Sequence, residues 1–267
     1  NLDDIVKIKK NSVGIEGSSI YLYNGEEITL KDLLYGLMLR SGNDSAVAIA
    51  THIGGSVDNF IEMMNDKAKS IGANSTNFTN PHGLHNDNHY TSAYDLALIT
   101  REAMRNRTFK KICKTKLWIS DRDKNKYFYN KNKTLWQYDG GDGVKIGYTR
   151  KAGRCLVSSA TKNGMQLISV VLNDYSWFND CYRLFNYGFS NYNPMIIYDE
   201  NQYIRSIPVN NGKKSFVPIV TKEDLMVPLT NEERDNIKTV VKVPKSVDAP
   251  LKESQQIGKI EVYLKGQ

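Results

Sequence analysis

The stretch Leu34-Tyr35-Gly36-Leu37-Met38-Leu39-Arg40-Ser41-Gly42-Asn43-Asp44 decides the fold, because it ends one amphipathic helix and leads into another. Apolar residues recur at i, i+3, i+4, i+7 and i+8 over 30–38, and Thr29 with Asp32 is placed as a variant of the capping box. The same period resumes over 46–53. The sequence therefore predicts a helix, a break and a helix, with a hydroxyl and a carboxamide in the break, where they can face a cleft.

The helical pattern continues on both sides of a later β-rich region. Apolar residues over 57–71 predict a third amphipathic helix that Gly72 ends, since glycine readily adopts the positive φ common after a helix. Ser92 is placed to cap a fourth helix. Apolar spacing over 177–188 predicts a closing helix against the sheet described next.

Two adjacent strands are expected over 154–162 and 165–173, where β-branched and apolar residues alternate. They flank Asn163-Gly164, the preferred pair for a type I′ turn, so an antiparallel hairpin is predicted.

Proline usage predicts a domain boundary. Six of the 7 prolines fall between Pro194 and Pro250, which indicates one domain over 1–192 and a second over 193–267. The second is expected to be a small all-β domain with prolines at turns and edges. Its short alternating segments are 195–207, 215–221, 224–228, 236–243 and 256–264.

The composition is that of a globular protein. Hydrophobic residues make up 40% of the 267 and charged residues 24%, which excludes a disordered or collagen-like chain. The net charge of +7 favours anionic partners such as cell-wall polymers, lipid headgroups or nucleic acid, or simply reflects a solvated surface. Cys113, Cys155 and Cys181 are odd in number, so at least one is a free thiol or pairs between chains.

A second short motif precedes the hairpin. Gly141-Asp142-Gly143-Val144-Lys145-Ile146-Gly147-Tyr148-Thr149 lies about 100 residues after Asn43. A lysine on a strand, followed by a glycine that lets a ligand approach the backbone, suits recognition of a carboxylate.

In this order, Ser41-Gly42-Asn43 and Lys145-Ile146-Gly147 resemble the S-x-N and K-T-G elements of penicillin-binding proteins and serine β-lactamases. The wider sequence resembles D-alanyl-D-alanine carboxypeptidases, the low-molecular-mass penicillin-binding proteins, including their sporulation-associated members. The likeness covers roughly residues 10–190, and the tail resembles the family's C-terminal domain. The segments that carry it are 17–22, 34–44, 79–84, 89–95 and 143–157. It implies an α/β transpeptidase-like domain, with helices on an antiparallel sheet, followed by a small all-β domain.

The resemblance also implies roles for residues. Ser41 would help pass a proton to the leaving amine, Asn43 would hold the substrate's peptide amide, and Lys145 would supply positive charge for the terminal carboxylate. Ile146, Gly147, Tyr148 and Thr149 would line the substrate, with the backbone N–H of Tyr148 in the oxyanion hole. The implied reaction is acyl transfer from a peptidoglycan stem peptide ending in D-Ala-D-Ala, with β-lactams as further ligands.

The resemblance further implies where the protein works and with what. It places the chain in a bacterial cell envelope, outside the cytoplasm, with no cofactor, no metal and no nucleic-acid partner. The family's usual signal peptide and C-terminal amphipathic anchor, which would give membrane-surface association, are not expected within these residues.

The nucleophile is the first departure from the family pattern. The family's Ser-x-x-Lys motif opens a helix well upstream of S-x-N, so its spacing points to a site before Asn1, and this chain alone is expected to be inactive. The one match here, Ser159 to Lys162, lies on a predicted strand. Side chains three apart on a strand point to opposite faces, so Lys162 could not activate Ser159.

The second departure is Ile146, where the family usually has threonine. A threonine hydroxyl there donates to the substrate carboxylate, and losing such a charged hydrogen bond costs about 1.5 to 3 kcal/mol. Thr149 could partly substitute for it.

Two other readings of the function remain. A catalytically inactive wall-binding or regulatory protein is favoured by the missing nucleophile and by Ile146. A serine β-lactamase is disfavoured, because Gly42 stands where class A enzymes have aspartate.

Two local patterns have simpler interpretations than a ligand site. His82, His85 and His89 have spacing that could suit zinc, but no familiar signature completes the set, so loop packing is expected. Gly140-Gly141-Asp142-Gly143 is expected to be a turn and not a phosphate cradle.

Overall fold

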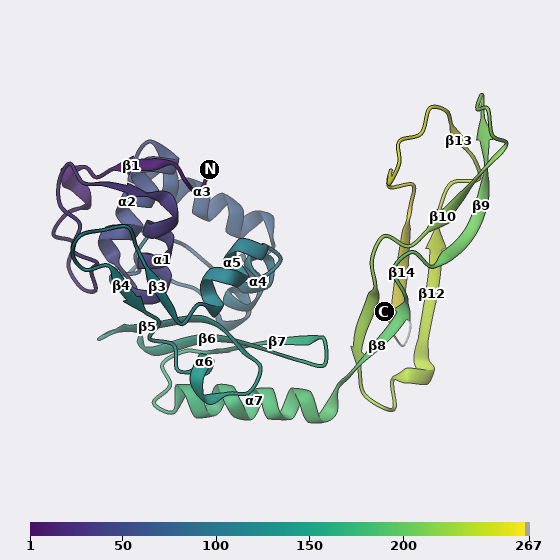
Figure 1. The fold of residues 1–267 in the computed structure, drawn as a ribbon. Coiled ribbons are helices and arrows are strands. Elements are labelled where there is room, and N and C mark those ends of the chain that lie inside the picture. The colour runs from purple at the N-terminus through teal and green to yellow at the C-terminus, as the bar shows by residue number, and fades with distance from the viewer. Residues whose placement is uncertain (265–267) are drawn as a thin grey trace. The chain divides into compact units, whose positions relative to one another are not determined.

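The computed structural model describes residues 1–264 (Figure 1). The chain forms two compact units, residues 1–162 with 166–186 and residues 163–165 with the chain from 187 onward. The predicted domain boundary at 192–193 falls where helix α7 ends and strand β8 begins, slightly after this division. The boundary itself stays a prediction.

The predicted helices of the first unit are present, and their ends follow the sequence signals. Thr29 accepts a hydrogen bond from the backbone N–H of Asp32 at the start of α1, and Ser92 caps α4 in the same way. Gly72 follows α3 with φ +85°, as expected for a helix stop. The bounds are α1 Leu30–Arg40, α2 Asn43–Gly54, α3 Val57–Ser70 and α4 Ala93–Ala103.

Several short elements were not predicted. Strands β1 and β2 pair antiparallel beside α1, and β3 and β4 form a hairpin whose inner residues, Trp118 and Phe128, pack in the core around α1. Trp118 stacks on Tyr35 with ring centroids 3.9 Å apart. The bounds are β1 Ile5–Lys7, a 3-10 turn Lys10–Ser12, β2 Glu27–Thr29, α5 Arg107–Lys114, β3 Leu117–Ile119, β4 Tyr127–Tyr129 and α6 Thr134–Gln137.

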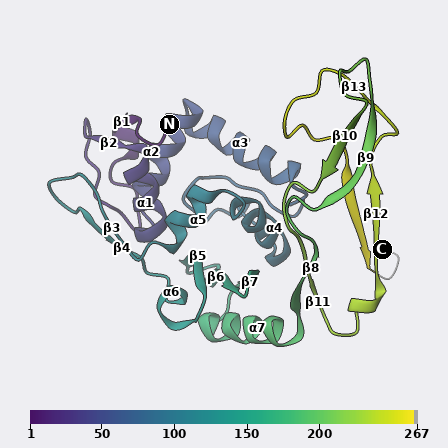
Figure 2. The same cartoon turned by 45° about the vertical axis from the view of Figure 1, so that its right-hand side comes forward.

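The first unit contains a three-stranded sheet, in the order β5-β6-β7. Asn163 and Gly164 both have positive φ in the turn between β6 and β7, which confirms the predicted hairpin. Figures 1 and 2 show α4 and α5 above this sheet and α7 below it. The bounds are β5 Gly141–Thr149, β6 Gly153–Lys162, β7 Met165–Val171 and α7 Trp177–Asn191.

Each face of the sheet has its own apolar cluster. Val144 packs with Met104 and Cys113 on one side, while Leu156 packs with Phe178 and other residues of α7 on the other. The first unit therefore has helices α4 and α5 on one face of the sheet and α7 on the other, as the sequence predicted helices packed on a sheet for this part of the chain.

The second unit is β-rich, as predicted. The expected single segment 195–207 is instead two strands, because the chain turns at Glu200-Asn201, where Asn201 has φ +59°. The bounds are β8 Asn193–Tyr198, β9 Tyr203–Asn210, β10 Phe216–Val220, β11 Leu225–Leu229, a 3-10 turn Arg234–Asn236, β12 Ile237–Lys242, β13 Val247–Asp248 and β14 Lys259–Leu264. Within residues 1–264, no helix combines the length and apolar character that a membrane span requires.

Candidate active site

Ser41 lies in the predicted break between α1 and α2. Its backbone is left-handed, with φ +59° and ψ 37°, and its N–H donates to the carbonyl of Gly36, so the chain turns sharply after Arg40. A side chain at Gly42 would come within 2.8 Å of Ser45 Oγ and 2.9 Å of Asp44 Oδ1. The tight turn therefore requires glycine at 42, and it presents the half-exposed hydroxyl of Ser41 next to the helix start.

Lys145 of β5 meets that hydroxyl. Its ammonium nitrogen Nζ lies 2.5 Å from Ser41 Oγ and also donates to the carbonyl of Ile146 at 2.9 Å. The structure thus brings together two groups that are 104 positions apart in the sequence.

Burial lowers the pKa of Lys145 to about 8, and the positive charge of Lys131 contributes to the lowering. A lysine with such a pKa can exchange protons near neutral pH, unlike an exposed lysine.

Two further cations near this lysine were missed by sequence reasoning. Burial, with the charge of Arg40, lowers the pKa of Lys131. Lys131 follows Asn130, whose side-chain amide donates to the carbonyls of Cys113 and Thr115 and fixes the turn. The only sequence signal was this asparagine-flanked lysine, which does not by itself indicate a site.

Asn43 is the first residue of α2 and is buried. Its side-chain Nδ2 donates to the carbonyl of Glu16 at 2.6 Å, and its backbone N–H donates to the carbonyl of Ser18 at 2.8 Å. Within residues 1–264, no hydrogen bond to its Oδ1 is found, so this oxygen can accept from a ligand. Asn43 lies two residues after Ser41 but contacts the loop over residues 16–22, called the strap below.

The predicted substrate-binding residues occupy the end of β5. This strand pairs on one side with β6, in the register Ile146↔Leu156, Gly147↔Cys155, Tyr148↔Arg154 and Thr149↔Gly153, and its other side is an edge of the three-stranded sheet. Gly147 and Tyr148 are exposed. Edge strands offer unpaired backbone groups to an extended peptide.

Ile146 and Thr149 contact other parts of the fold. Ile146 packs against the apolar cluster that α7 makes with Leu156, since neighbouring strand residues face opposite ways. Thr149 Oγ1 accepts from the backbone N–H of Ala152 at 3.0 Å, which holds its hydroxyl in the following turn.

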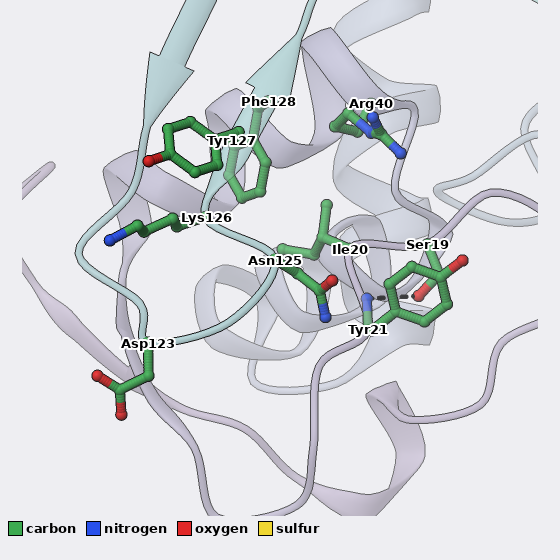
Figure 3. A pocket seen from close by; sticks show the side chains of 9 residues that line it. All are labelled: Ser19, Ile20, Tyr21, Arg40, Asp123, Asn125, Lys126, Tyr127 and Phe128. Carbon is green, nitrogen blue, oxygen red and sulfur yellow. Dashed lines mark hydrogen bonds between the residues drawn. The ribbon is translucent and has the colours of Figure 1, made fainter.

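A pocket of about 380 Å³ lies beside Arg40, the residue before Ser41. Figure 3 shows its walls, with Ser19, Ile20 and Tyr21 of the strap on one side and residues of β4 and its preceding loop on the other. Arg40 and Lys126 give it positive charge, and Asp123 supplies a carboxylate.

The remaining candidate groups have structural surroundings. All three cysteines are free thiols, and burial raises the pKa of Cys113 to about 12 and that of Cys181 to about 11. Such thiols are poor nucleophiles near neutral pH.

The three histidines of 82–89 pack in their loop. Nδ1 of His82 accepts from Leu84 N–H and Nδ1 of His89 from Thr79 N–H, while His85 contacts Asp87. In the part of the chain that the structure describes, no group of three or more His, Cys, Asp or Glu could hold a metal ion. Ser159 and Lys162 both lie on β6, and Ser159 is fully buried.

Comparison with known proteins gives consistent matches over the whole chain. Residues 1–176 match the family profile described as D-alanyl-D-alanine carboxypeptidase, and residues 192–267 match the penicillin-binding protein 5 C-terminal domain. The chain is 33% identical to the D-alanyl-D-alanine carboxypeptidase DacF of Bacillus subtilis, over 100% of this chain and 70% of that protein. It is 33% identical to DacA of Haemophilus influenzae, over 98% of this chain and 69% of that protein.

Solved structures are also similar. Penicillin binding protein 5 from Haemophilus influenzae superposes with a TM-score of 0.76 at 32% identity, over 100% of this chain and 80% of that one. A peptidoglycan synthesis regulatory factor, PBP3, from Streptococcus pneumoniae superposes with a TM-score of 0.78 at 25% identity, over 97% of this chain and 78% of that one.

Proposed function

This chain belongs to the D-alanyl-D-alanine carboxypeptidase family. From that premise we propose that it forms the substrate-binding part of a serine-type carboxypeptidase that acts on peptidoglycan. The enzyme removes the terminal D-Ala of a stem peptide through an acyl-enzyme, and β-lactams bind at the same site. The observation that carries the proposal is the contact of Lys145 Nζ with Ser41 Oγ, which joins the helix break to the edge strand.

The leaving amine needs a proton when the peptide bond breaks. We assign its delivery to Ser41, because the hydroxyl can donate to the amine while accepting from Lys145. With a pKa of about 8, Lys145 can restore that proton near neutral pH. The acyl group passes to the serine nucleophile that enzymes of this family use, and water then releases it as the shortened peptide.

The substrate backbone would lie along the free edge of β5. The N–H of Tyr148 is one donor for the oxyanion that forms at the scissile carbonyl, and Oδ1 of Asn43 accepts from the substrate's amide. Lys145, with Lys131 and Arg40 nearby, supplies positive charge for the terminal carboxylate.

The setting of this chemistry follows from the family. The protein acts in the cell envelope, outside the cytoplasm, because peptidoglycan is there. We also propose association with the membrane surface, which fractionation of the intact protein from cells would test: release without detergent contradicts it.

Labelling with a fluorescent penicillin tests the function in the intact protein, expressed from its complete gene. We expect covalent labelling, release of D-Ala from a diacyl-D-Ala-D-Ala peptide, and a loss of roughly 10²- to 10⁴-fold in both for Ser41→Ala and Lys145→Ala. Lys114→Ala is the matched control, because Lys114 also reaches β5 but binds Asp142 away from Ser41. Absence of any adduct would favour the inactive wall-binding reading, and rapid turnover of a chromogenic cephalosporin would favour a β-lactamase.

A further inference from the structure

The mechanism above does not use Asp44, a buried carboxylate next to Asn43. Asp44, in the first turn of α2, is 1% exposed, yet no lysine or arginine among residues 1–264 forms an ion pair with it. Its oxygens accept from Ser19 Oγ at 2.5 Å and from the backbone N–H groups of Ile20, Leu22 and Ser45 at 2.9–3.1 Å. Three of these four donors belong to the strap, so the carboxylate acts mainly to hold that segment.

The strap in turn fixes the side chain of Asn43. The carbonyl of Glu16 accepts from Asn43 Nδ2, and the carbonyl of Ser18 accepts from Asn43 N–H. Between them, a Cβ at Gly17 would lie 2.7 Å from Nδ2, so the strap backbone touches the amide directly. With Nδ2 bound in this way, Oδ1 is the atom left for a ligand.

The strap is also held by its own packing, because Ile20 and Leu22 belong to the apolar core around α1. It contains no helix or strand, and Tyr21 adopts φ +62°. Ser19 Oγ, which donates to Asp44, also accepts from Tyr21 N–H at 2.8 Å, the contact drawn in Figure 3. Arg122 donates to the carbonyls of Ile20 and Tyr21.

We propose that Asp44 is a positioning residue for the active site, which holds the strap so that the strap aims the amide of Asn43 at the substrate. The inference rests on the proposed function, because it concerns how Asn43 acts. An aspartate is required here and asparagine does not suffice. The amide nitrogen of asparagine would face backbone N–H groups in either orientation. In place of Oδ1 it would leave Ser45 N–H without an acceptor, and in place of Oδ2 it would leave Leu22 N–H without one.

A double-mutant cycle tests the proposal in the intact protein. The rate of acylation by a fluorescent penicillin is measured for Asp44→Asn, Asn43→Ala and the pair. If Asp44 acts through Asn43, Asp44→Asn slows acylation roughly tenfold or more, and the double variant is no slower than Asn43→Ala alone.

Asp95 is the matched control. It is 3% exposed and accepts from Ser75 N–H and Thr76 Oγ1, both at 2.7 Å, so it pins a loop to α4 as Asp44 pins the strap to α2. Asp95→Asn should lower the melting temperature comparably but leave acylation within about twofold. Equal effects of the two asparagine variants on acylation, or fully multiplicative effects of Asp44→Asn and Asn43→Ala, would overturn the proposal.

Two further measurements keep the test decisive. If Asp44→Asn does not fold, Ser19→Ala removes one donor from the half-exposed strap and should slow acylation about threefold, again with no added effect on Asn43→Ala. If the wild type is not labelled, the proposed function fails. The positioning role can then still be tested by NMR of the Asn43 side-chain amide. Its slow hydrogen exchange with solvent should be lost in Asp44→Asn, and an unchanged signal refutes the positioning role.

Discussion

Replacing Lys145 with methionine should raise the free energy of unfolding of the first unit at neutral pH. This gain over the wild type should shrink as the pH rises. Methionine has a similar length and no charge. A pKa lowered from 10.5 to about 8 means that the folded state holds the charged lysine at a cost of about 3 kcal/mol. Because Lys145 is partly accessible to solvent, about 1 to 3 kcal/mol is the expected range.

The pH window follows from the two pKa values. Between pH 8 and 10.5, the unfolded chain keeps a proton on Lys145 that the folded chain has lost, so the stability of the wild type rises with pH. The methionine variant lacks this rise. From pH 7 to 9.5, the stability of the wild type minus that of the variant should therefore increase by about 1 to 2 kcal/mol.

Urea unfolding followed by tryptophan fluorescence measures this difference. Trp118, Trp136 and Trp177, all the tryptophans of the chain, lie in the first unit, so the signal reports that unit alone. Lys114→Met is the control, since Lys114 is exposed and paired with Asp142. If the free energies of unfolding of the wild type and Lys145→Met differ by the same amount at pH 7 and pH 9.5, the lowered pKa of Lys145 is refuted.

Three other substitutions test separate parts of the site. Ile146→Thr should cost about 1 kcal/mol of packing against α7 in urea unfolding and leave the rate of acylation close to the wild-type value, because the side chain at 146 faces α7 and not the face that carries Lys145; a tenfold faster acylation would contradict this orientation. Gly17→Ala should slow acylation at least tenfold with a smaller loss of stability, because its methyl group displaces the Asn43 amide and φ is +96°; wild-type kinetics would show that the strap yields. Arg122→Met should destabilise the first unit by about 3 to 5 kcal/mol by leaving Glu26 buried and unpaired, and Glu26→Gln in the same chain should recover part of this; a loss under 1 kcal/mol in thermal unfolding argues against the buried pair.

The long elements of the fold were predictable because each has its own periodic signal. α1, α3 and α4 end at capping or glycine positions visible in the sequence, and Asn163-Gly164 marked the β6–β7 turn. The missed strands β1 to β4 are three residues each, too short for a period to show. They exist because of distant partners, as when Trp118 stacks on Tyr35 and donates to Asp32.

The site was less predictable from local sequence signals than the long helices and strands were. Local signals marked Ser41 and Asn43 in a helix break and Lys145 on a strand, but only the family resemblance joined them, since nothing in the local pattern joins residues 104 positions apart. Lys131 and Arg40 affect the site only through charge across space, which a linear sequence does not show. The role of Asp44 depends on which backbone N–H groups converge on it, and that requires coordinates.

The cluster of positive charge beside Ser41 has a consequence for ligand binding. Within residues 1–264, no carboxylate forms an ion pair with Lys145, Lys131 or Arg40, and their mutual repulsion contributes to the lowered pKa values of the two lysines. A bound carboxylate reverses this repulsion and must raise the pKa of Lys145, so above pH 8 binding takes up a proton. By the same linkage, affinity for a carboxylate ligand falls as pH rises above 8, whereas a neutral ligand of the same shape shows no such fall. The repulsion that lowers the pKa values of the two lysines therefore favours a negatively charged ligand beside Ser41.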